Sequence, residues 1–254
     1  MFFLAIHNLP EDRSALAPAL ASALGITSYE AGVRLRVSGS GPLVVATFGE
    51  RTAADEVRRK LEASGLTAVM ISDVEIASAQ KEFPVRTFRF NDHTLHAESQ
   101  KQETLAVDYR TIFLIIRGTG IKQETSTVTT KEKKFDMGKA VLTGGLIISK
   151  TVKTTGQKIT EEREGFFYVY AEGVPPLVFR EGVLDYSSLG PALQPSRTAN
   201  FTALLAEIRR RSPQARFDDR LITRAGQVQL LGPSLDVQKY LGVAVELLVR
   251  VLLR

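Results

Sequence analysis

The stretch of residues 122–158 places the strongest constraint on what this chain can fold into. It contains eight lysines, no arginine and three acidic residues. Because β-branched side chains favour strands, residues 124–130 and 146–152 are predicted to form an extended hairpin and not an irregular loop. The uncharged segment 140–149 at its centre contains a Gly-Gly pair. The chain is therefore expected to hold a long, basic, strand-forming segment.

An apolar segment rimmed by lysines is typical of a contact surface, because contiguous apolar patches on a protein surface generally mark binding sites. Clustered lysines near an anionic membrane contribute on the order of 1 kcal/mol each. The same lysines are also typical of a solvated hairpin, in which they protect strand edges from aggregation. The predicted contact residues are, for the anionic surface, Lys131, Lys133, Lys134, Lys139, Lys150 and Lys153, and, for apolar contact, Val141, Leu142, Leu146, Ile147 and Ile148.

The net charge of +5 equals the charge of this stretch, 8 − 3 = +5, so the basic character is local. A protein that mainly coats nucleic acid more often spreads arginines over one face. Base stacking in the stretch is disfavoured, because Phe135 is the one aromatic residue between Lys122 and Asp136. Nucleic acid, or the ribosome, stays the alternative partner to an anionic lipid surface.

Length and composition indicate a globular protein of two domains. A chain of 254 residues with 44% hydrophobic residues is long and apolar enough to bury real cores. The absence of cysteine excludes disulfides, thiolate metal sites and cysteine nucleophiles, and is compatible with a reducing compartment. No signal-peptide pattern and no apolar run of about 20 residues occurs. The prediction is a cytoplasmic protein with no transmembrane segment, and peripheral attachment to the membrane is the alternative.

The predicted fold class is α+β, and its first domain covers residues 1–78. Thr27 and Glu30 form a capping-box pattern, in which both side chains satisfy free amides of a helix's first turn. Gly25 and Gly65 each stand where a helix is expected to end. The expected order is β-α-α-β-α-β, with strands at 2–6, 42–48 and 67–71, helices from Pro10 to Gly25 and from Thr27 to near Val37, and a helix from Thr52 to Gly65.

Three segments of this domain, Ala23–Ala31, Ser38–Pro42 and Ala53–Gly65, resemble the C-terminal domain of the bacterial ribosomal stalk protein. In that family, lysines on the paired helices engage translation factors, and this chain has Arg34 and Arg36 on the corresponding helix. The resemblance implies a small protein-binding platform. For the chain as a whole, the predicted partner is another protein or a second copy of this chain.

A linker at 79–84 is predicted to lead into a β-rich domain at 85–232, an antiparallel barrel or sandwich. Apolar residues alternate along its first strands, and Asn91-Asp92 is typical of a hairpin turn. Antiparallel strands followed by one amphipathic helix are similar to a pleckstrin-homology module. The predicted strands are 85–90, 94–98, 105–109, 112–116, 165–170 and 177–180, followed by a capping helix at 200–212, with 118–164 as an insertion between strands.

Residues 233–254 are predicted to form a final amphipathic helix. Glu246, Arg250 and Arg254 make a narrow polar stripe, and apolar residues occupy most of the remaining circumference. A helix this apolar must be covered. Three partners are expected for this helix: its own chain, a second copy of the chain, or a membrane.

The candidate residues for chemistry each have a structural explanation. His93 and His96 are spaced so that a strand would point their rings to opposite faces, which favours surface histidines over a metal site. Asp218-Asp219 can serve a metal or acid–base chemistry, but flanking arginines favour local ion pairs. The residues Tyr168, Tyr170 and Tyr186 are interpreted as core or barrel-wall residues, with base stacking as the alternative.

Motifs for catalysis are absent from the sequence. Neither G-x-x-x-x-G-K-[ST] nor G-x-G-x-x-G occurs, which excludes nucleotide binding by those loops, and Gly-x-Ser-x-Gly is also absent. Ser40, between two glycines, is interpreted as part of a turn. The sequence therefore predicts a non-enzymatic binding or regulatory protein, with no catalytic, cofactor or metal residue. Its first domain would contact protein and its basic hairpin an anionic surface or partner subunit. An enzyme without a recognisable motif is the third alternative.

Overall fold

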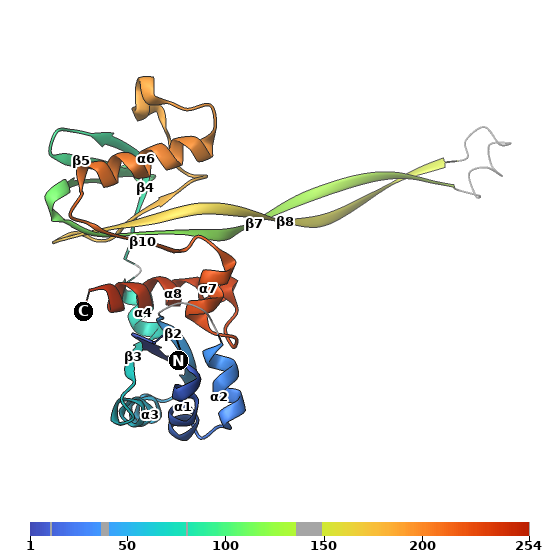
Figure 1. Cartoon of the computed structure of the whole chain (residues 1–254). Coiled ribbons are helices and arrows are strands. Elements are labelled where there is room, and N and C mark those ends of the chain that lie inside the picture. Colours follow the sequence, from blue (N-terminus) through green and yellow to red (C-terminus); the bar gives the residue numbers. More distant parts are fainter. Residues whose placement is uncertain (11, 37–40, 80, 136–148, 254) are drawn as a thin grey trace. The chain divides into compact units, whose positions relative to one another are not determined.

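The computed structural model describes residues 1–10, 12–36, 41–79, 81–135 and 149–253 (Figure 1). For 79, 122–135 and 149–162 the description is of the backbone alone. The chain divides into two units, Met1–Gly120 with Glu164–Arg254, and Ile121–Arg163, which are described separately. The domain boundary predicted at residues 79–84 stays a prediction.

A three-stranded antiparallel sheet forms the first part of the larger unit. Its order is β2-β1-β3, so the almost fully buried strand β1 lies in the middle. Leu4 and Ile6 of β1 pack with Leu20 and Leu61 of the covering helices, and all four are fully buried. The elements are β1 (Phe2–His7), η1 (Ser14–Leu16), α1 (Ala17–Leu24), α2 (Ser28–Leu35), β2 (Leu43–Phe48), α3 (Arg51–Ala63) and β3 (Thr67–Ser72).

Local signals in the sequence explain where these helices begin and end. The Glu30 amide donates to Thr27 Oγ1 at 3.2 Å, and the Thr27 amide donates back to Glu30 Oε2 at 2.8 Å. The predicted capping box is confirmed. Gly25 ends α1 in the left-handed region, at φ 65°, which glycine adopts without steric cost. The order β-α-α-β-α-β is thus confirmed.

A seven-stranded sheet forms the second part of the larger unit and extends into the smaller one. Its order is β10-β7-β8-β9-β4-β5-β6, in which β10 lies parallel to β7 and β9 parallel to β4. The chain is therefore α+β, as predicted. The strands are β4 (Phe83–Phe90), β5 (Thr94–Ser99), β6 (Thr104–Asp108), β7 (Ile112–Phe135), β8 (Ser149–Ala171), β9 (Leu177–Arg180) and β10 (Arg216–Leu221).

The predicted pleckstrin-homology-like barrel is not confirmed. The strand order has two ends, β10 and β6, and no pairing between them is seen among the described residues. Two of its pairings are parallel, whereas the predicted barrel was antiparallel throughout. The order of elements along a chain does not fix which strands pair, and the parallel partners here are separated by roughly a hundred residues.

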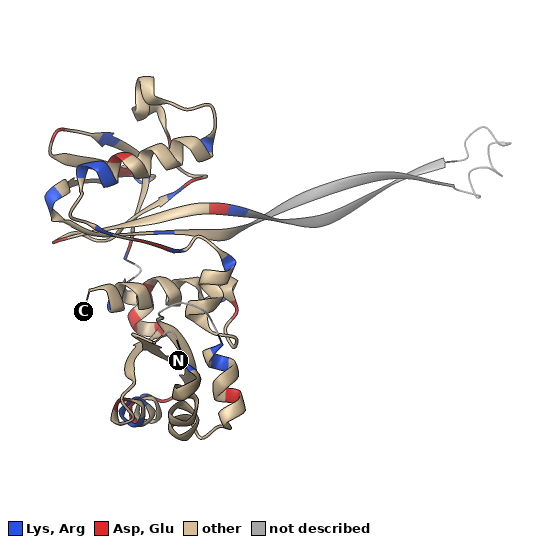
Figure 2. Ribbon diagram, in the orientation of Figure 1, with Lys and Arg blue, Asp and Glu red and all other residues tan. Residues whose placement is uncertain are grey.

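Helix α6 (Arg197–Arg211) covers one face of this sheet through Phe201, Leu204, Leu205 and Ile208, as the predicted apolar spacing requires. The last turn of α6 carries three arginines, two of which pair with Glu207 at 2.7 and 2.6 Å. Cations are favourable there because the C-terminus of a helix is negative. Other basic residues outside the lysine-rich stretch occur on α2 and α3 (Figure 2).

The opposite face of the sheet packs on the C-terminal helices α7 (Arg224–Leu231) and α8 (Val237–Leu252). Alternate residues of β8 are buried on opposite faces, Phe167 in the α6 core and Tyr168 in the α8 core. The apolar face of α8 is therefore covered by its own chain. No helix among the described residues is long and apolar enough to cross a bilayer.

The lysine-rich stretch lies mainly in the smaller unit. Residues 124–130 lie in β7 and 149–152 in β8, two neighbouring strands, so the backbone hairpin is confirmed for these residues. No side chain of its proposed contact residues is described, and their role stays untested. For Lys131, Lys133, Lys134, Lys150 and Lys153 the side chains are not described, and Lys139, Val141, Leu142, Leu146, Ile147 and Ile148 are not described at all.

We expect Leu204→Ala to lower the free energy of unfolding by about 2–5 kcal/mol, because it opens a cavity in the α6 core. Leu204 is fully buried, whereas Leu193 is 53% exposed. Leu193→Ala is therefore the matched control and should change stability little. Urea unfolding followed by circular dichroism measures both, and equal losses would contradict the assigned packing.

Candidate functional site

A cavity of about 280 Å³ lies beside strand β2, and we call it the β2 pocket. Five consecutive residues of β2 form one wall, and Arg34 of α2 also lines the pocket. The lining residues are Leu24, Ile26, Arg34, Val44, Val45, Ala46, Thr47, Phe48, Ser234 and Leu235. Of these ten, eight belong to the first sheet, its helices and the loop between α1 and α2, and two belong to the loop before α8.

The walls of the β2 pocket are held by specific contacts. Among the described strands β2 pairs with β1 alone, so its second edge is not used by the sheet. Arg34 Nη1 donates a hydrogen bond to the Val45 carbonyl. Gly232 has φ 72°, and a Cβ built there would collide with the Val44 carbonyl oxygen. The chain can therefore pass close to β2 and place Ser234 opposite it.

The chemistry of the β2 pocket is that of binding and orientation. Arg34 supplies a permanent positive charge, Thr47 and Ser234 supply hydroxyls, and the other side chains are apolar. A guanidinium presents five N–H donors in a fixed fork, which suits a carboxylate or phosphate. The lining holds no carboxylate or imidazole to take a proton. The pocket thus fits a small molecule with an apolar part and an anionic group.

The residues singled out in the sequence lie elsewhere. His93 precedes β5 and His96 lies on it, and no group of three potential metal ligands occurs among the described residues. Asp218 pairs with Arg220 at 2.8 Å, as the local ion-pair interpretation predicts. Tyr168, Tyr170 and Tyr186 are buried in the cores. Sequence reasoning noted Arg34 but had no signal for its pocket, whose walls are separated by about 190 residues.

A cluster of acids and tyrosines lies where α8 packs on β8. The Tyr168 hydroxyl donates to Glu82 Oε1 at 2.7 Å, and burial raises the pKa of Tyr168 and of Tyr170. Burial also raises the pKa of Glu246 on α8 to about 7; Arg250 opposes this shift and Glu82 adds to it. Glu246 therefore changes charge near neutral pH within a largely apolar contact.

Comparison with known protein families finds a match in the first part of the chain. Residues 3–66 match the family described as GHMP kinases C terminal. The matched segment is 64 of 254 residues, about a quarter of the chain, and it spans most of the first sheet with its helices. No curated protein and no solved structure matches the chain.

The match corrects two predictions. The resemblance to the ribosomal stalk domain is wrong, because the same residues match a kinase family instead. An order of three helices and a small sheet recurs in proteins of unrelated function, so it could not identify one family. The prediction of a non-enzymatic binding protein is also wrong, because members of the matched family are kinases. Peripheral attachment to a membrane gains no support either.

We expect Glu246→Gln to stabilise the protein at pH 8 and to have less effect at pH 5. The pKa of Glu246 in the folded state, about 7, exceeds its ordinary value of 4.5. The free-energy cost of burying the Glu246 charge is therefore absent below pH 4.5 and complete above pH 7. Glu246 is partly exposed, and solvent screens its charge. The difference in free energy of unfolding between Glu246→Gln and the wild type should therefore change by on the order of 1 kcal/mol between pH 5 and pH 8. Urea titrations measure it.

The exposed Glu172 provides the control for this experiment. Glu172→Gln removes the same charge without relieving burial, so it should give no comparable gain in stability. A pH-independent difference between Glu246→Gln and the wild type would show that Glu246 is not held in a desolvated position.

Proposed function

We propose that this chain is an enzyme of phosphoryl transfer, a kinase of small molecules, and that its substrate binds in the β2 pocket. The observation that carries this proposal is a coincidence of two independent results. Eight of the ten residues that line the β2 pocket fall within residues 3–66, the segment similar to the kinase family. The described cavity thus lies on the part of the chain for which a class of reaction is indicated.

The proposed role of the pocket is to position the substrate. Catalysis of phosphoryl transfer depends mainly on positioning and on electrostatic stabilisation, because the protein does little covalent chemistry. Arg34 binds an anionic group of the substrate, and Thr47 and Ser234 offer hydrogen bonds to its polar atoms. The apolar residues Leu24 and Leu235 contact the rest of the molecule.

The proposed reaction moves the γ-phosphoryl group of a nucleoside triphosphate to a hydroxyl of the substrate. The bond between the β- and γ-phosphates breaks, an O–P bond forms, the diphosphate leaves, and the hydroxyl proton is released to solvent. The sequence contains neither common glycine-rich phosphate loop. In this proposal the nucleotide is therefore bound by residues that do not follow those two patterns.

We expect the protein with MgATP to form ADP when a suitable hydroxylated metabolite is added. The test is a panel of sugars, hydroxy acids and amino alcohols, assayed by coupled ADP release and by ³¹P NMR of the product. Arg34→Gln should lower kcat/KM by about tenfold to a hundredfold, mainly through KM, because a charge-assisted hydrogen bond to the substrate is lost.

Arg36 provides the matched control, since it is exposed at the end of the same helix and does not line the pocket. Arg36→Gln should leave kcat/KM unchanged, and thermal melting should show both variants folded. Absence of substrate-dependent ADP formation across the panel, together with no binding of ATP by calorimetry, would refute the proposed activity. Equal effects of Arg34→Gln and Arg36→Gln would show that the substrate does not bind in the β2 pocket.

A further inference from the structure

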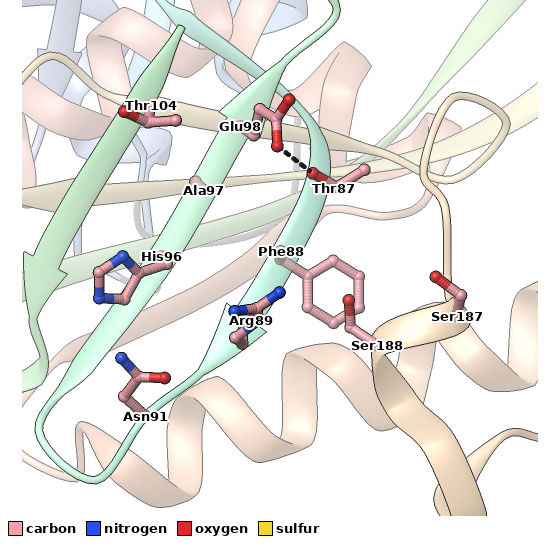
Figure 3. A pocket seen from close by; sticks show the side chains of 10 residues that line it. All are labelled: Thr87, Phe88, Arg89, Asn91, His96, Ala97, Glu98, Thr104, Ser187 and Ser188. Carbon is pink, nitrogen blue, oxygen red and sulfur yellow. Dashed lines mark hydrogen bonds between the residues drawn. The ribbon is translucent and has the colours of Figure 1, made fainter. Parts of the chain in front are cut away.

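A second cavity, of about 470 Å³, is built by the seven-stranded sheet, and we call it the β4–β5 pocket (Figure 3). Its volume is within the usual range of small-molecule sites, about 300–1,000 Å³. It shares no residue with the β2 pocket and lies outside the kinase-like segment. Its lining residues are Thr87, Phe88, Arg89, Asn91, His96, Ala97, Glu98, Thr104, Ser187 and Ser188.

Strand register gathers the polar residues of this pocket on one side of the sheet. Arg89 lies opposite His96, and Thr87 lies opposite Glu98. Residues directly opposite each other in an antiparallel pair share a face, and faces alternate along a strand. The four side chains therefore share one face, while the intervening Phe88 is buried in the α6 core. Glu98 also lies opposite Thr104 of β6, which extends the polar row.

The second wall is the 3-10 helix η3 (Ser187–Ala192), and local bonds hold it against β4. The Asp185 amide donates to the Arg86 carbonyl at 2.9 Å, and the Ser187 amide donates to Asp185 Oδ1 at 2.9 Å. Tyr186 is buried and meets the Phe88 ring edge-on, with 6.5 Å between ring centroids. Ser187 and Ser188 are thereby held next to β4, where they line the same cavity as the polar row, so the pocket is formed before any ligand enters.

The cationic end of the pocket has unused hydrogen-bonding capacity. Within the described part of the chain, no hydrogen bond or ion pair involves the Arg89 guanidinium, the His96 ring or the Asn91 side-chain amide. Other arginines nearby are paired: Arg86 donates to the Val183 carbonyl, and Arg211 donates to the Asn91 carbonyl at 2.8 Å. Arg211 thus fixes the β4–β5 turn, while Arg89 keeps its donors for another group.

The opposite end of the pocket accepts hydrogen bonds. Glu98 lies two cross-strand pairs further from the turn than His96, and its Oε2 accepts from Thr87 Oγ1 at 3.3 Å. Figure 3 shows Arg89, His96 and Asn91 toward the turn, with Thr87 and Glu98 toward the other end. Positive charge and free donors are thus separated from a carboxylate along one cavity.

We infer that the β4–β5 pocket binds a small metabolite that carries an oxyanion at one end and hydroxyls at the other. Arg89, His96 and Asn91 bind the phosphate or carboxylate group, because charge-assisted N–H···O⁻ bonds are roughly twice as strong as hydrogen bonds between neutral groups. Glu98 accepts from a hydroxyl of the ligand, and Ser187 and Ser188 hydrogen-bond to its polar atoms. This site is separate from the proposed kinase substrate pocket.

The test uses three probes that differ in one group: glycerol 3-phosphate, glycerate and glycerol. Calorimetry without nucleotide should show binding of glycerol 3-phosphate, glycerate or both, and none of glycerol. Whichever charged probe binds more tightly identifies the oxyanion as phosphate or carboxylate. Arg89→Gln should weaken that binding at least tenfold, and Glu98→Gln should weaken it without changing the affinity for inorganic phosphate.

Arg110→Gln is the matched control. Arg110 is 86% exposed, pairs with Asp108 at 2.6 Å and does not line the pocket. The Arg110→Gln variant should bind the probes as the wild type does. Thermal melting is used to check that every variant is folded. Failure of both charged probes to bind at 10 mM, equal binding of glycerol, or equal behaviour of Arg89→Gln and Arg110→Gln would overturn the inference. The Arg34→Gln variant should bind normally, so this outcome is independent of the kinase proposal.

Discussion

The packing of α8 is the interaction on which the larger unit depends. One hydrophobic cluster includes Phe3 and Ile71 of the three-stranded sheet and Tyr168 and Val178 of the seven-stranded sheet. Helix α8 belongs to this cluster, with Leu247 and Leu248 fully buried. Each sheet has another core of its own on its far face, formed with α1 and α3 or with α6. Without α8, one face of each sheet would lose its apolar cover.

The polar residues of α8 are part of the same packing. Arg250 donates to the Met70 carbonyl at 2.8 Å and to Glu75 Oε1 at 2.5 Å, so it joins α8 to β3 and to α4 (Asp73–Ala79). The Arg250 guanidinium makes two hydrogen bonds, and the one to Glu75 is charge-assisted. Together they stabilise the contact and fix the orientation of α8 against β3 and α4. Burial raises the pKa of Glu75, but the bonds from Arg250 and Ser72 outweigh it, and the net pKa falls to about 2. Glu75 therefore stays charged, and the ion pair persists, across the physiological range.

The sequence predicted the elements whose signals are local and missed those that depend on distant partners. Capping residues and glycines located α1 to α3, and the apolar spacing of Phe201 to Ile208 located α6. Strand β10, with the sequence Arg-Phe-Asp-Asp-Arg-Leu, carries four charged residues and was interpreted as a source of ion pairs. It is a terminal strand of the sheet order, where charged side chains are tolerated. Its parallel partner β7 lies about a hundred residues earlier, which no local pattern reveals.

The sequence could not predict the two pockets either, because the residues that line each of them are far apart along the chain. In the β2 pocket, this separation makes one wall depend on the packing of a distant helix. Its wall residues Ser234 and Leu235 come directly before α8, whose first turn is capped by Asp236 through bonds to the amides of Gln238 and Lys239. The position of this wall is therefore set by the same helix that covers both sheets. The part of a ligand's binding energy that comes from Ser234 and Leu235 is available only while α8 is packed. Binding in the β2 pocket and the packing of α8 must consequently stabilise each other, because any ligand that prefers the packed state shifts the equilibrium toward it.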